Sequence, residues 1–423
     1  MRPKVRAIVK GFSWVPSLYF AEGLPYIIVM SLAGIMYTRM GVDNSRMALF
    51  TSLLTLPWVI KPLWSPFVDI FSSRRRWIVV TQISIAAILL AIALAIPGQL
   101  YFRITIGAFF IVAFLSATYD IAADGFYIDA LDSSMQSFFV GIRTTFYRIA
   151  MMAAQGPLVM LAGYFEQSSG DIPGSWALIF YILSGVFIFI AVYHFIVLPS
   201  PDARIKEKRR SGAEVWSEFL DTFRSFFMKP GIGGALLFIL LYRLPEAQLV
   251  KLIPPFLLDS VENGGLGLTT VQEGAVYGTV GVIGLLAGGI TGGIVASRSG
   301  LRRWLKPMAW SMSLTCLTFV YLSFADAPSL LTVNICVGLE QFGYGFGCTA
   351  YMLYLLMFSA GDRPASHYAV CTGLMALGIM LPGMVAGYIQ QLLGYRGFFL
   401  WTTLCCVATV GVCYMIRLPK HDE

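Results

Sequence analysis

Residues 116–131 read S-A-T-Y-D-I-A-A-D-G-F-Y-I-D-A-L, and residues 141–148, after a short polar turn, read G-I-R-T-T-F-Y-R. The first run ends a long apolar segment and holds three aspartates, whereas the second run lies in the next apolar segment and holds two arginines. Charged side chains are costly inside a lipid bilayer, so those found in spanning segments are candidates for function. The first candidates are therefore Asp120, Asp124, Asp129, Arg143 and Arg148.

The composition is that of a protein that crosses the membrane many times. Of the 423 residues, 57% are hydrophobic and 13% are charged, and the mean hydropathy is +0.73. A helix needs about 20 apolar residues to cross the hydrocarbon core of a bilayer. We therefore predict an all-α membrane protein with twelve transmembrane helices, at residues 13–38, 46–68, 77–97, 101–129, 138–165, 176–198, 232–258, 272–297, 305–325, 329–358, 367–392 and 396–417.

Lysine and arginine are distributed unevenly around these spans. If the N-terminus is cytoplasmic, 21 of the 30 cationic residues lie on the inner side, four lie in outer turns and five lie within spans. Short cytoplasmic loops carry such an excess of Lys and Arg, so both termini are predicted to be cytoplasmic. This placement accounts for the net charge of +7 without a nucleic-acid partner.

The longest polar interval, residues 199–229, separates two sets of six spans. We predict an N-terminal six-helix bundle at 1–198, a cytoplasmic linker at 199–229 and a C-terminal six-helix bundle at 230–423. In the linker, apolar residues at helical spacing from Ala213 to Met228 predict an amphipathic helix on the membrane surface. R-R-R-W at 74–77 is echoed by L-R-R-W at 301–304. Such repeated halves resemble the major facilitator fold, in which two bundles rock around a midplane site.

The first copy of the basic turn follows an acidic residue, Asp69, which the second copy lacks. A gate latch built on a carboxylate at this turn would therefore be stronger in the N-terminal half, with Arg74, Arg75 and Arg76 as its basic members. Anchoring of the loop on the cytoplasmic side explains the three arginines equally well.

Five ionisable residues on five spans lie at similar depth. Counting about 1.5 Å of helical rise per residue from the end of each span places them about 14–16 Å from the surface, near the midplane. They are Glu22, Asp120, Arg148, Arg243 and Glu340.

The same depths predict that Asp120 pairs with Arg148 and that Asp124 pairs with Arg143. Such pairs are either fixed salt bridges between spans four and five or carboxylates that load and release a proton when the pair opens. The candidates for proton coupling are Asp120, Asp124, Glu22 and Glu340, and the gating candidates are Asp69, Arg74, Arg75, Arg76, Asp129 and Arg143.

Candidates for contact with a substrate flank these charges. Tyr19 and Tyr26 share a helix face with Glu22. Arg243 and Lys251 suit an anionic group, because guanidinium and ammonium groups pair with carboxylates and phosphates. Further candidates are Arg148, Gln155, Glu246, Gln341 and Tyr344. The glycines at 343, 345 and 347 permit either close approach of a neighbouring helix or a local break.

No catalytic or metal-binding pattern accompanies these residues. The sequence has no phosphate-binding loop and no zinc-ligand spacing, and its histidines (194, 367 and 421) are not paired with a nucleophile. The seven cysteines lie in predicted C-terminal helices without a C-x-x-C pair. We therefore predict no enzymatic activity, no cofactor and no bound metal.

Five motifs that occur in order along the chain resemble the AmpG-type permeases, major facilitator proteins related to the acetyl-coenzyme A transporters. The motifs are L-Y-F-x-x-G-L-P at 18–25, L-W-S-P-x-x-D at 63–69, D-I-x-x-D at 120–124, Y-R-x-x-M at 147–151 and G-x-G-x-T-A at 345–350. The resemblance covers nearly the whole chain. Glu22 is outside the family pattern and is a candidate from its position alone.

This resemblance implies proton-driven import of N-acetylglucosaminyl-anhydro-N-acetylmuramyl peptides across the bacterial inner membrane, for recycling of the cell wall. Carboxylates of such a muropeptide would suit Arg148 and Arg243, and its sugars would stack on Tyr19, Tyr26 and Tyr344. The expected partners are the muropeptide, protons and the lipid bilayer, and we expect a monomer.

Two other interpretations are open. A transporter of the same fold could carry another anionic solute, such as an acyl-coenzyme A or a siderophore-like metabolite, although a phosphate-rich cargo should require more cations than the cavity offers. A receptor that does not transport, or a membrane-embedded acyltransferase, would not accumulate cargo in vesicles.

Overall fold

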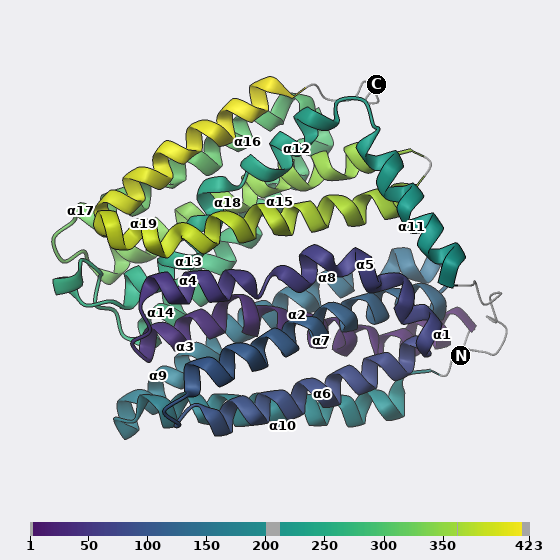
Figure 1. Cartoon of the computed structure of the whole chain (residues 1–423), viewed down its shortest axis with the longest axis horizontal. Helices are drawn as coiled ribbons and strands as arrows, with labels where there is room; N and C mark the ends of the chain where they lie inside the picture. The colour runs from purple at the N-terminus through teal and green to yellow at the C-terminus, as the bar shows by residue number, and fades with distance from the viewer. Residues whose placement is uncertain (1–2, 200–211, 362, 417–423) are drawn as a thin grey trace. The chain divides into compact units, whose positions relative to one another are not determined.

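The computed structural model describes residues 3–199, 212–361 and 363–416, and every regular element within these ranges is helical. All twelve predicted spans are helical, which confirms the predicted all-α architecture (Figure 1). Contacts between residues divide the chain into two compact units, and each is described here by itself.

The first unit comprises the residues up to Ala33 together with Ile60–Ser217. Its helices are α1 (Pro3–Phe12), α2 (Val15–Ile27), the π-helix η1 (Ile28–Leu32), α5 (Leu56–Phe71), α6 (Arg74–Ala95), α7 (Tyr101–Ala130), α8 (Ser133–Gln155), α9 (Pro157–Ser169) and α10 (Ile172–Val197). Its buried core includes Trp14, Tyr19, Phe126 and Phe139.

The second unit comprises Gly34–Val59 and the chain from Glu218 onward. It contains α3 (Ala33–Arg39), α4 (Asn44–Leu53), α12 (Ile232–Leu241), α13 (Leu244–Leu258), η2 (Val261–Asn263), α14 (Thr270–Ala275), the π-helix η3 (Val276–Gly281), α15 (Val282–Ser299), α16 (Leu301–Thr315), α17 (Leu317–Phe324), α18 (Leu330–Ser359) and α19 (Pro364–Met415). The linker helix α11 (Gly212–Phe227) crosses the boundary between the units. Division into bundles at 1–198 and 230–423, joined by a linker at 199–229, remains a prediction.

By length and composition alone, eight of the described helices could cross a membrane, or nine if the bent pair Leu220–Phe227 and Ile232–Leu258 is one span. One of the eight, Ser366–Met415, contains two of the predicted spans. They are separated at Gly394, whose φ of 67° and ψ of 175° are not helical. A residue with a side chain rarely adopts a positive φ, so a glycine at this position allows the sharp turn between two antiparallel spans.

Short polar turns start the helices. A side-chain oxygen in the residue before the first turn accepts a backbone N–H that has no partner within the helix. Asp43 caps α4, Ser73 caps α6, Asp132 caps α8 and Asp171 caps α10 in this way. The caps place the helix starts at residues 44, 74, 133 and 172, a few residues before the predicted span starts at 46, 77, 138 and 176.

Helices α15 and α18 pack with their backbones in near contact. A Cβ atom at Gly288 would lie 2.1 Å from the Phe342 carbonyl oxygen, and one at Gly345 would lie 2.1 Å from the Leu285 carbonyl oxygen. Helix α18 is continuous through Gly343, Gly345 and Gly347, so these glycines permit close approach and not a break. Small residues allow membrane helices to associate in this way.

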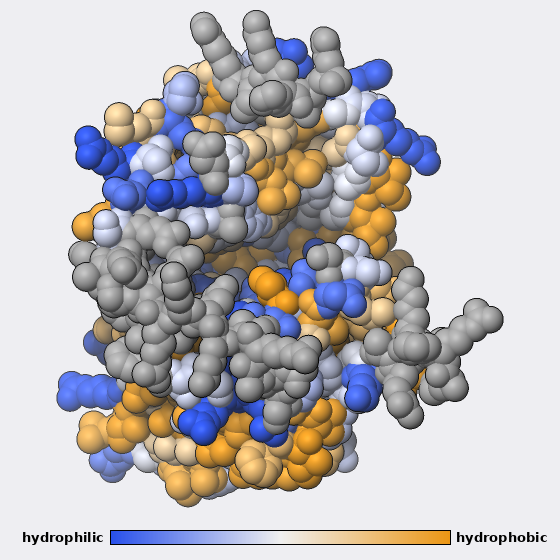
Figure 2. Space-filling model, turned by 90° about the vertical axis from the view of Figure 1, so that its right-hand side faces the viewer, coloured by the Kyte–Doolittle hydropathy of each residue, from blue (hydrophilic) through white to orange (hydrophobic). Residues whose placement is uncertain are grey.

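The outer faces of α6 and α10 are apolar. Large hydrophobic side chains are exposed there, including Ile83, Leu94, Phe189, Phe195 and Ile196. Figure 2 shows this apolar surface as orange atoms along its lower edge, where α10 and α6 lie in Figure 1. Exposed apolar side chains on spanning helices are expected to face lipid, because there is no water in the bilayer core to disfavour them.

Candidate functional site

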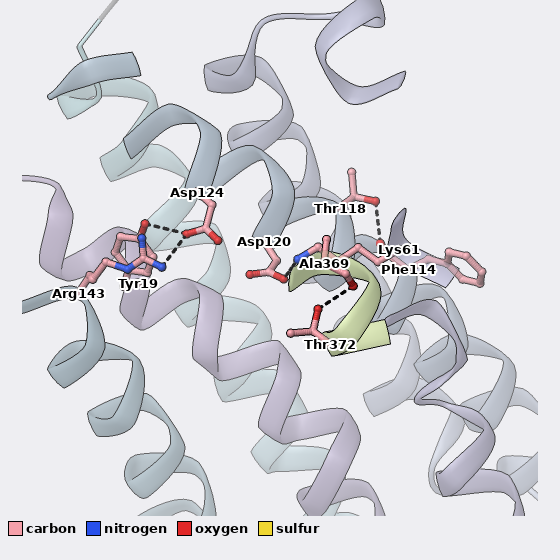
Figure 3. Close-up of polar contacts among 9 residues, drawn as sticks. All are labelled: Tyr19, Lys61, Phe114, Thr118, Asp120, Asp124, Arg143, Ala369 and Thr372. Carbon is pink, nitrogen blue, oxygen red and sulfur yellow. Dashed lines mark hydrogen bonds and ion pairs between the residues drawn. The ribbon is translucent and has the colours of Figure 1, made fainter. Parts of the chain in front are cut away.

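The charged residues of the first unit converge on helix α7. Asp120 and Asp124 lie one turn apart on this helix, and each carboxylate has a different cationic partner (Figure 3). Lys61, from α5, forms an ion pair with Asp120, and the two side chains are 26% and 23% exposed. This pair ties α5 to α7 at a place that is only partly shielded.

Asp124 joins three helices. Its Oδ1 atom accepts a hydrogen bond from the Tyr19 hydroxyl of α2 at 3.0 Å and lies 3.0 Å from Arg143 Nη2 of α8. The Arg143 guanidinium also lies over the rings of Tyr19, at 4.5 Å, and Tyr127, at 5.2 Å. Cations are attracted to the faces of aromatic rings, so Arg143 is held by a carboxylate and by two rings. The predicted pairing of Asp124 with Arg143 is confirmed.

Glu22 is the third carboxyl group of this cluster. It lies on α2, almost one turn after Tyr19, and is only 8% exposed. Its carboxyl group lies close enough to those of Asp120 and Asp124 for their charges to interact. Asp120 is paired with Lys61 and Asp124 with Arg143. Glu22 is therefore the carboxyl group of this cluster whose charge is least balanced by a cation.

Close packing holds Glu22 in place. A Cβ atom at the next residue, Gly23, would lie 2.7 Å from the carbonyl oxygen of Tyr147 on α8. The backbones of α2 and α8 are therefore in near contact beside the carboxyl group. Further along the same pair of helices, Gln155 Nε2 donates to Ser31 Oγ at 3.0 Å, and the rings of Tyr26 and Tyr147 lie 6.4 Å apart.

The predicted pairing of Asp120 with Arg148 is wrong. Arg148 lies five residues beyond Arg143 on α8 and so is turned about 140° around the helix from it. Only one of the two arginines can face the aspartates of α7, and Arg148 is exposed. Depth along the spans placed Arg148 near the level of Asp120, but depth alone does not tell which way a side chain points around its helix.

The true partner of Asp120, Lys61, was missed as a site residue. Its signal was nevertheless present, because it is an isolated cation between Ile60 and Pro62 in an apolar span. An ionisable residue within a span is a functional candidate by default.

Among the predicted gating residues of the basic turn, Arg74 joins two helices. Its Nη1 atom lies 2.8 Å from Asp129 Oδ2 and donates to the Gly125 carbonyl oxygen at 2.7 Å, which ties the start of α6 to the end of α7. Arg75 Nη2 donates to the Phe195 carbonyl oxygen at 2.6 Å, and Arg76 is exposed. Asp69 lies in α5, but its side chain is outside the described part of the structure.

The second unit holds its own polar group around Arg243, between α12 and α13. The Arg243 guanidinium donates to the Tyr344 hydroxyl and lies 5.3 Å from the centre of that ring and 6.0 Å from the centre of the Tyr351 ring. Glu246 and Glu340 are buried, and their carboxyl groups interact with each other. Glu340 Oε2 also accepts from Gln341 Nε2 at 2.9 Å. The structure thus brings four of the predicted residues together with Arg243.

Metal binding finds no support within the described residues, where no group of three or more His, Cys, Asp or Glu side chains could hold an ion. The charged groups of the two units are arranged as ion pairs, buried carboxyl groups and cation–aromatic contacts. Such arrangements can bind and release protons and anions without a bound cofactor.

Comparisons with known proteins agree with this architecture. The profile of the Major Facilitator Superfamily matches residues 16–387. A protein of Rickettsia conorii named putative transporter AmpG 4 is 26% identical over 93% of this chain and 94% of its own length. The anhydromuropeptide permease of Escherichia coli strain K12 is 26% identical over 92% of this chain and 76% of its own length. These relatives confirm the resemblance to the AmpG-type permeases.

Among solved structures, a D-xylose-proton symporter superposes with a TM-score of 0.74 at 10% identity, covering 97% of this chain and 98% of its own. At that identity the likeness concerns the fold alone. Together with the twelve helical spans and the match of the family profile, it shows that the chain belongs to the major facilitator superfamily and is a membrane transporter of a small molecule, not an enzyme.

Proposed function

We propose that this transporter imports anhydro-muropeptides, N-acetylglucosaminyl-anhydro-N-acetylmuramyl peptides, by proton symport for recycling of the cell wall. The cargo is proposed from the resemblance to the AmpG-type permeases and from the name of the Escherichia coli relative. The observation that supports coupling to protons is the cluster of three carboxyl groups, those of Glu22, Asp120 and Asp124, with the two cations Lys61 and Arg143.

The charges of this cluster explain why a proton would be its natural partner. Lys61 balances Asp120 and Arg143 balances Asp124, so Glu22 has no cation of its own among these contacts. One proton on Glu22 makes the cluster neutral. A buried charge without a partner is costly, and the cluster therefore takes up a proton when it is closed from water and releases it when helix movement exposes Glu22 or separates one of the pairs.

Cationic, aromatic and polar side chains are proposed to bind the cargo. Its lactyl and peptide carboxylates are proposed to pair with Arg243 and Arg148, because a guanidinium forms two parallel hydrogen bonds with a carboxylate. Its sugar rings are proposed to stack on Tyr19, Tyr26 and Tyr344. Amide and hydroxyl groups of the peptide stem would use the remaining polar residues, which are Gln155, Glu246 and Gln341.

The transporter is proposed to work as a monomer in the bacterial inner membrane, with both termini in the cytoplasm. This orientation is inferred from the distribution of Lys and Arg, which favours a cytoplasmic location of the basic turns at 74–76 and 302–303 and of the linker. Transport would follow from alternating access, as two six-helix bundles rock around the cargo.

The test is uptake of radiolabelled anhydro-muropeptide tripeptide into proteoliposomes of the purified protein, with and without an inward proton gradient. We expect accumulation that needs the gradient and disappears when a protonophore is added. An acyl-coenzyme A, the alternative cargo, should not compete for uptake. Accumulation without a gradient would contradict symport, and an absence of uptake by folded protein would contradict the cargo.

A further inference from the structure

Lys251 is a buried cation outside the two charged groups described above. It lies on α13, eight residues and about 12 Å beyond Arg243 along the helix. Lys251 is 5% exposed, and its Nζ atom donates a hydrogen bond to Thr51 Oγ1 of α4 at 3.3 Å. Among the described residues no carboxylate lies within ion-pair distance of it. An ammonium group has three hydrogen-bond donors, and one neutral hydroxyl neither occupies all of them nor balances the positive charge as an anion would.

Helix α19 packs closely against α4 and α13, the two helices that the contact between Lys251 and Thr51 joins. A Cβ atom at Gly383 of α19 would lie 2.6 Å from Ser52 Oγ and 3.3 Å from the carbonyl oxygen of Ala247 on α13. One at Gly387 would lie 2.1 Å from the carbonyl oxygen of Asn44. Larger residues at these two glycines would therefore force the helices apart.

Thr51 leaves most of the Lys251 ammonium group without a partner. Thr51 Oγ1 donates its own proton to the Met47 carbonyl oxygen at 2.8 Å and so accepts from Lys251. Lys251 makes no other hydrogen bond to a described residue. Two of its ammonium donors are therefore available to an anion.

We propose that Lys251, beside Thr51, forms an anion subsite that pairs with a carboxylate of the cargo when α4 separates from α13. This inference rests on the proposed function and its orientation, in which this end of α13 faces the outside. In the closed arrangement Lys251 is shielded, so a cargo carboxylate reaches it only while α4 is apart from α13. Cargo binding would therefore favour the arrangement that is open to the outside, because a ligand shifts a conformational equilibrium by its differential affinity for the two states.

The experiment compares two probes on purified protein in nanodiscs. One is the anhydro-muropeptide tripeptide with free carboxylates, and the other is the same molecule with its carboxylates converted to methyl esters. Wild-type protein should bind the acid at least tenfold more tightly than the ester. Lys251→Met should lose a large part of this preference, the remainder coming from Arg243 and Arg148, while its affinity for the ester stays within twofold of wild type. Lys251→Arg should keep the preference, and Lys306→Met, which removes an exposed lysine over the Tyr414 ring, serves as the matched control.

The outcomes separate this inference from the proposed function. Wild-type protein that binds neither probe would remove the cargo and this subsite with it. Wild-type protein that binds both probes, with the acid preference kept in Lys251→Met, would overturn the subsite and leave the cargo in place. If Lys251→Met does not fold, Lys251→Arg decides, because loss of the acid preference in a folded variant that keeps the charge would also overturn the subsite.

Discussion

Arg143 Nη2 lies 3.0 Å from Asp124 Oδ1, and the same guanidinium lies over the rings of Tyr19 and Tyr127. The two residues come from α8 and α7, and the tyrosines add α2 to the contact. Because the arginine is held by aromatic faces as well as by the carboxylate, the charge of Asp124 can change without release of the whole assembly.

Asp124→Asn should abolish proton-driven uptake and leave the protein folded. Asparagine keeps the shape of the side chain and can still accept from Tyr19, but it removes the charge that faces Arg143. Gradient-driven uptake into proteoliposomes measures the first effect, and the melting temperature (Tm) in detergent measures the second. Normal uptake by this variant would mean that Asp124 serves only as a structural tie.

Glu22→Gln should uncouple transport from the proton gradient. A glutamine side chain is neutral, as a protonated carboxyl group is, but it cannot release a proton. Accumulation driven by the gradient should fall at least tenfold, whereas exchange of labelled for unlabelled cargo across the membrane should persist. Glu166→Gln is the control, because Glu166 is equally buried in the same unit and accepts from the Trp176 indole at 2.8 Å. Gradient-driven accumulation at the wild-type level in Glu22→Gln would exclude Glu22 as the proton carrier.

Lys61→Met should destabilise the protein, and a second change should restore it. Removal of one partner of a shielded ion pair leaves the other charge uncompensated. Because both side chains are about a quarter exposed, we expect a loss of about 1–3 kcal/mol in the free energy of unfolding, less than for a fully buried pair. The double variant Lys61→Met with Asp120→Asn should recover most of the lost Tm. No recovery would show that Lys61 stabilises the fold by contacts other than the ion pair.

Gly288→Ala should weaken the packing of α15 against α18. The added Cβ atom would lie 2.1 Å from a backbone oxygen, so the helices must move apart, at a cost of about 1–3 kcal/mol. The matched control is Gly293→Ala on the same helix, where a Cβ atom meets nothing within 4 Å. Thermal unfolding in detergent should show a lower Tm for the first variant and an unchanged or higher one for the second. Equal values would contradict the close helix contact.

Arg74→Ala should slow transport more than it weakens binding. The substitution removes the contacts with Asp129 and the Gly125 carbonyl oxygen that join α6 to α7, at a distance along the chain from the proposed cargo contacts. The maximal uptake rate should fall severalfold with little change in KM. Arg76→Ala, at an exposed position of the same turn, should transport normally. If both variants behave alike, the turn serves to anchor the loop and not to gate transport.

Several features could be predicted from the sequence because their causes are local. The helical spans follow from runs of apolar residues, and their starts follow from side chains such as Asp43 and Asp132 that cap the next helix. The pairing of Asp124 with Arg143 was also accessible, because the two residues lie in consecutive spans joined by a short turn, at matching depth. The close packing allowed by Gly345 was one of two outcomes that its spacing permitted.

Other features were decided only by the tertiary structure. Lys61 meets Asp120 because α5 packs beside α7, and residues 59 positions apart cannot be matched by depth without knowledge of how each helix is rotated. The same rotation turns Arg148 away from the aspartates. The place of Gly34–Val59 within the second compact unit, and the cover that α4 gives to Lys251, depend on contacts across some 200 residues. Hydropathy specifies which segments enter the membrane, but the helix faces that meet are selected by the packing of all the helices together.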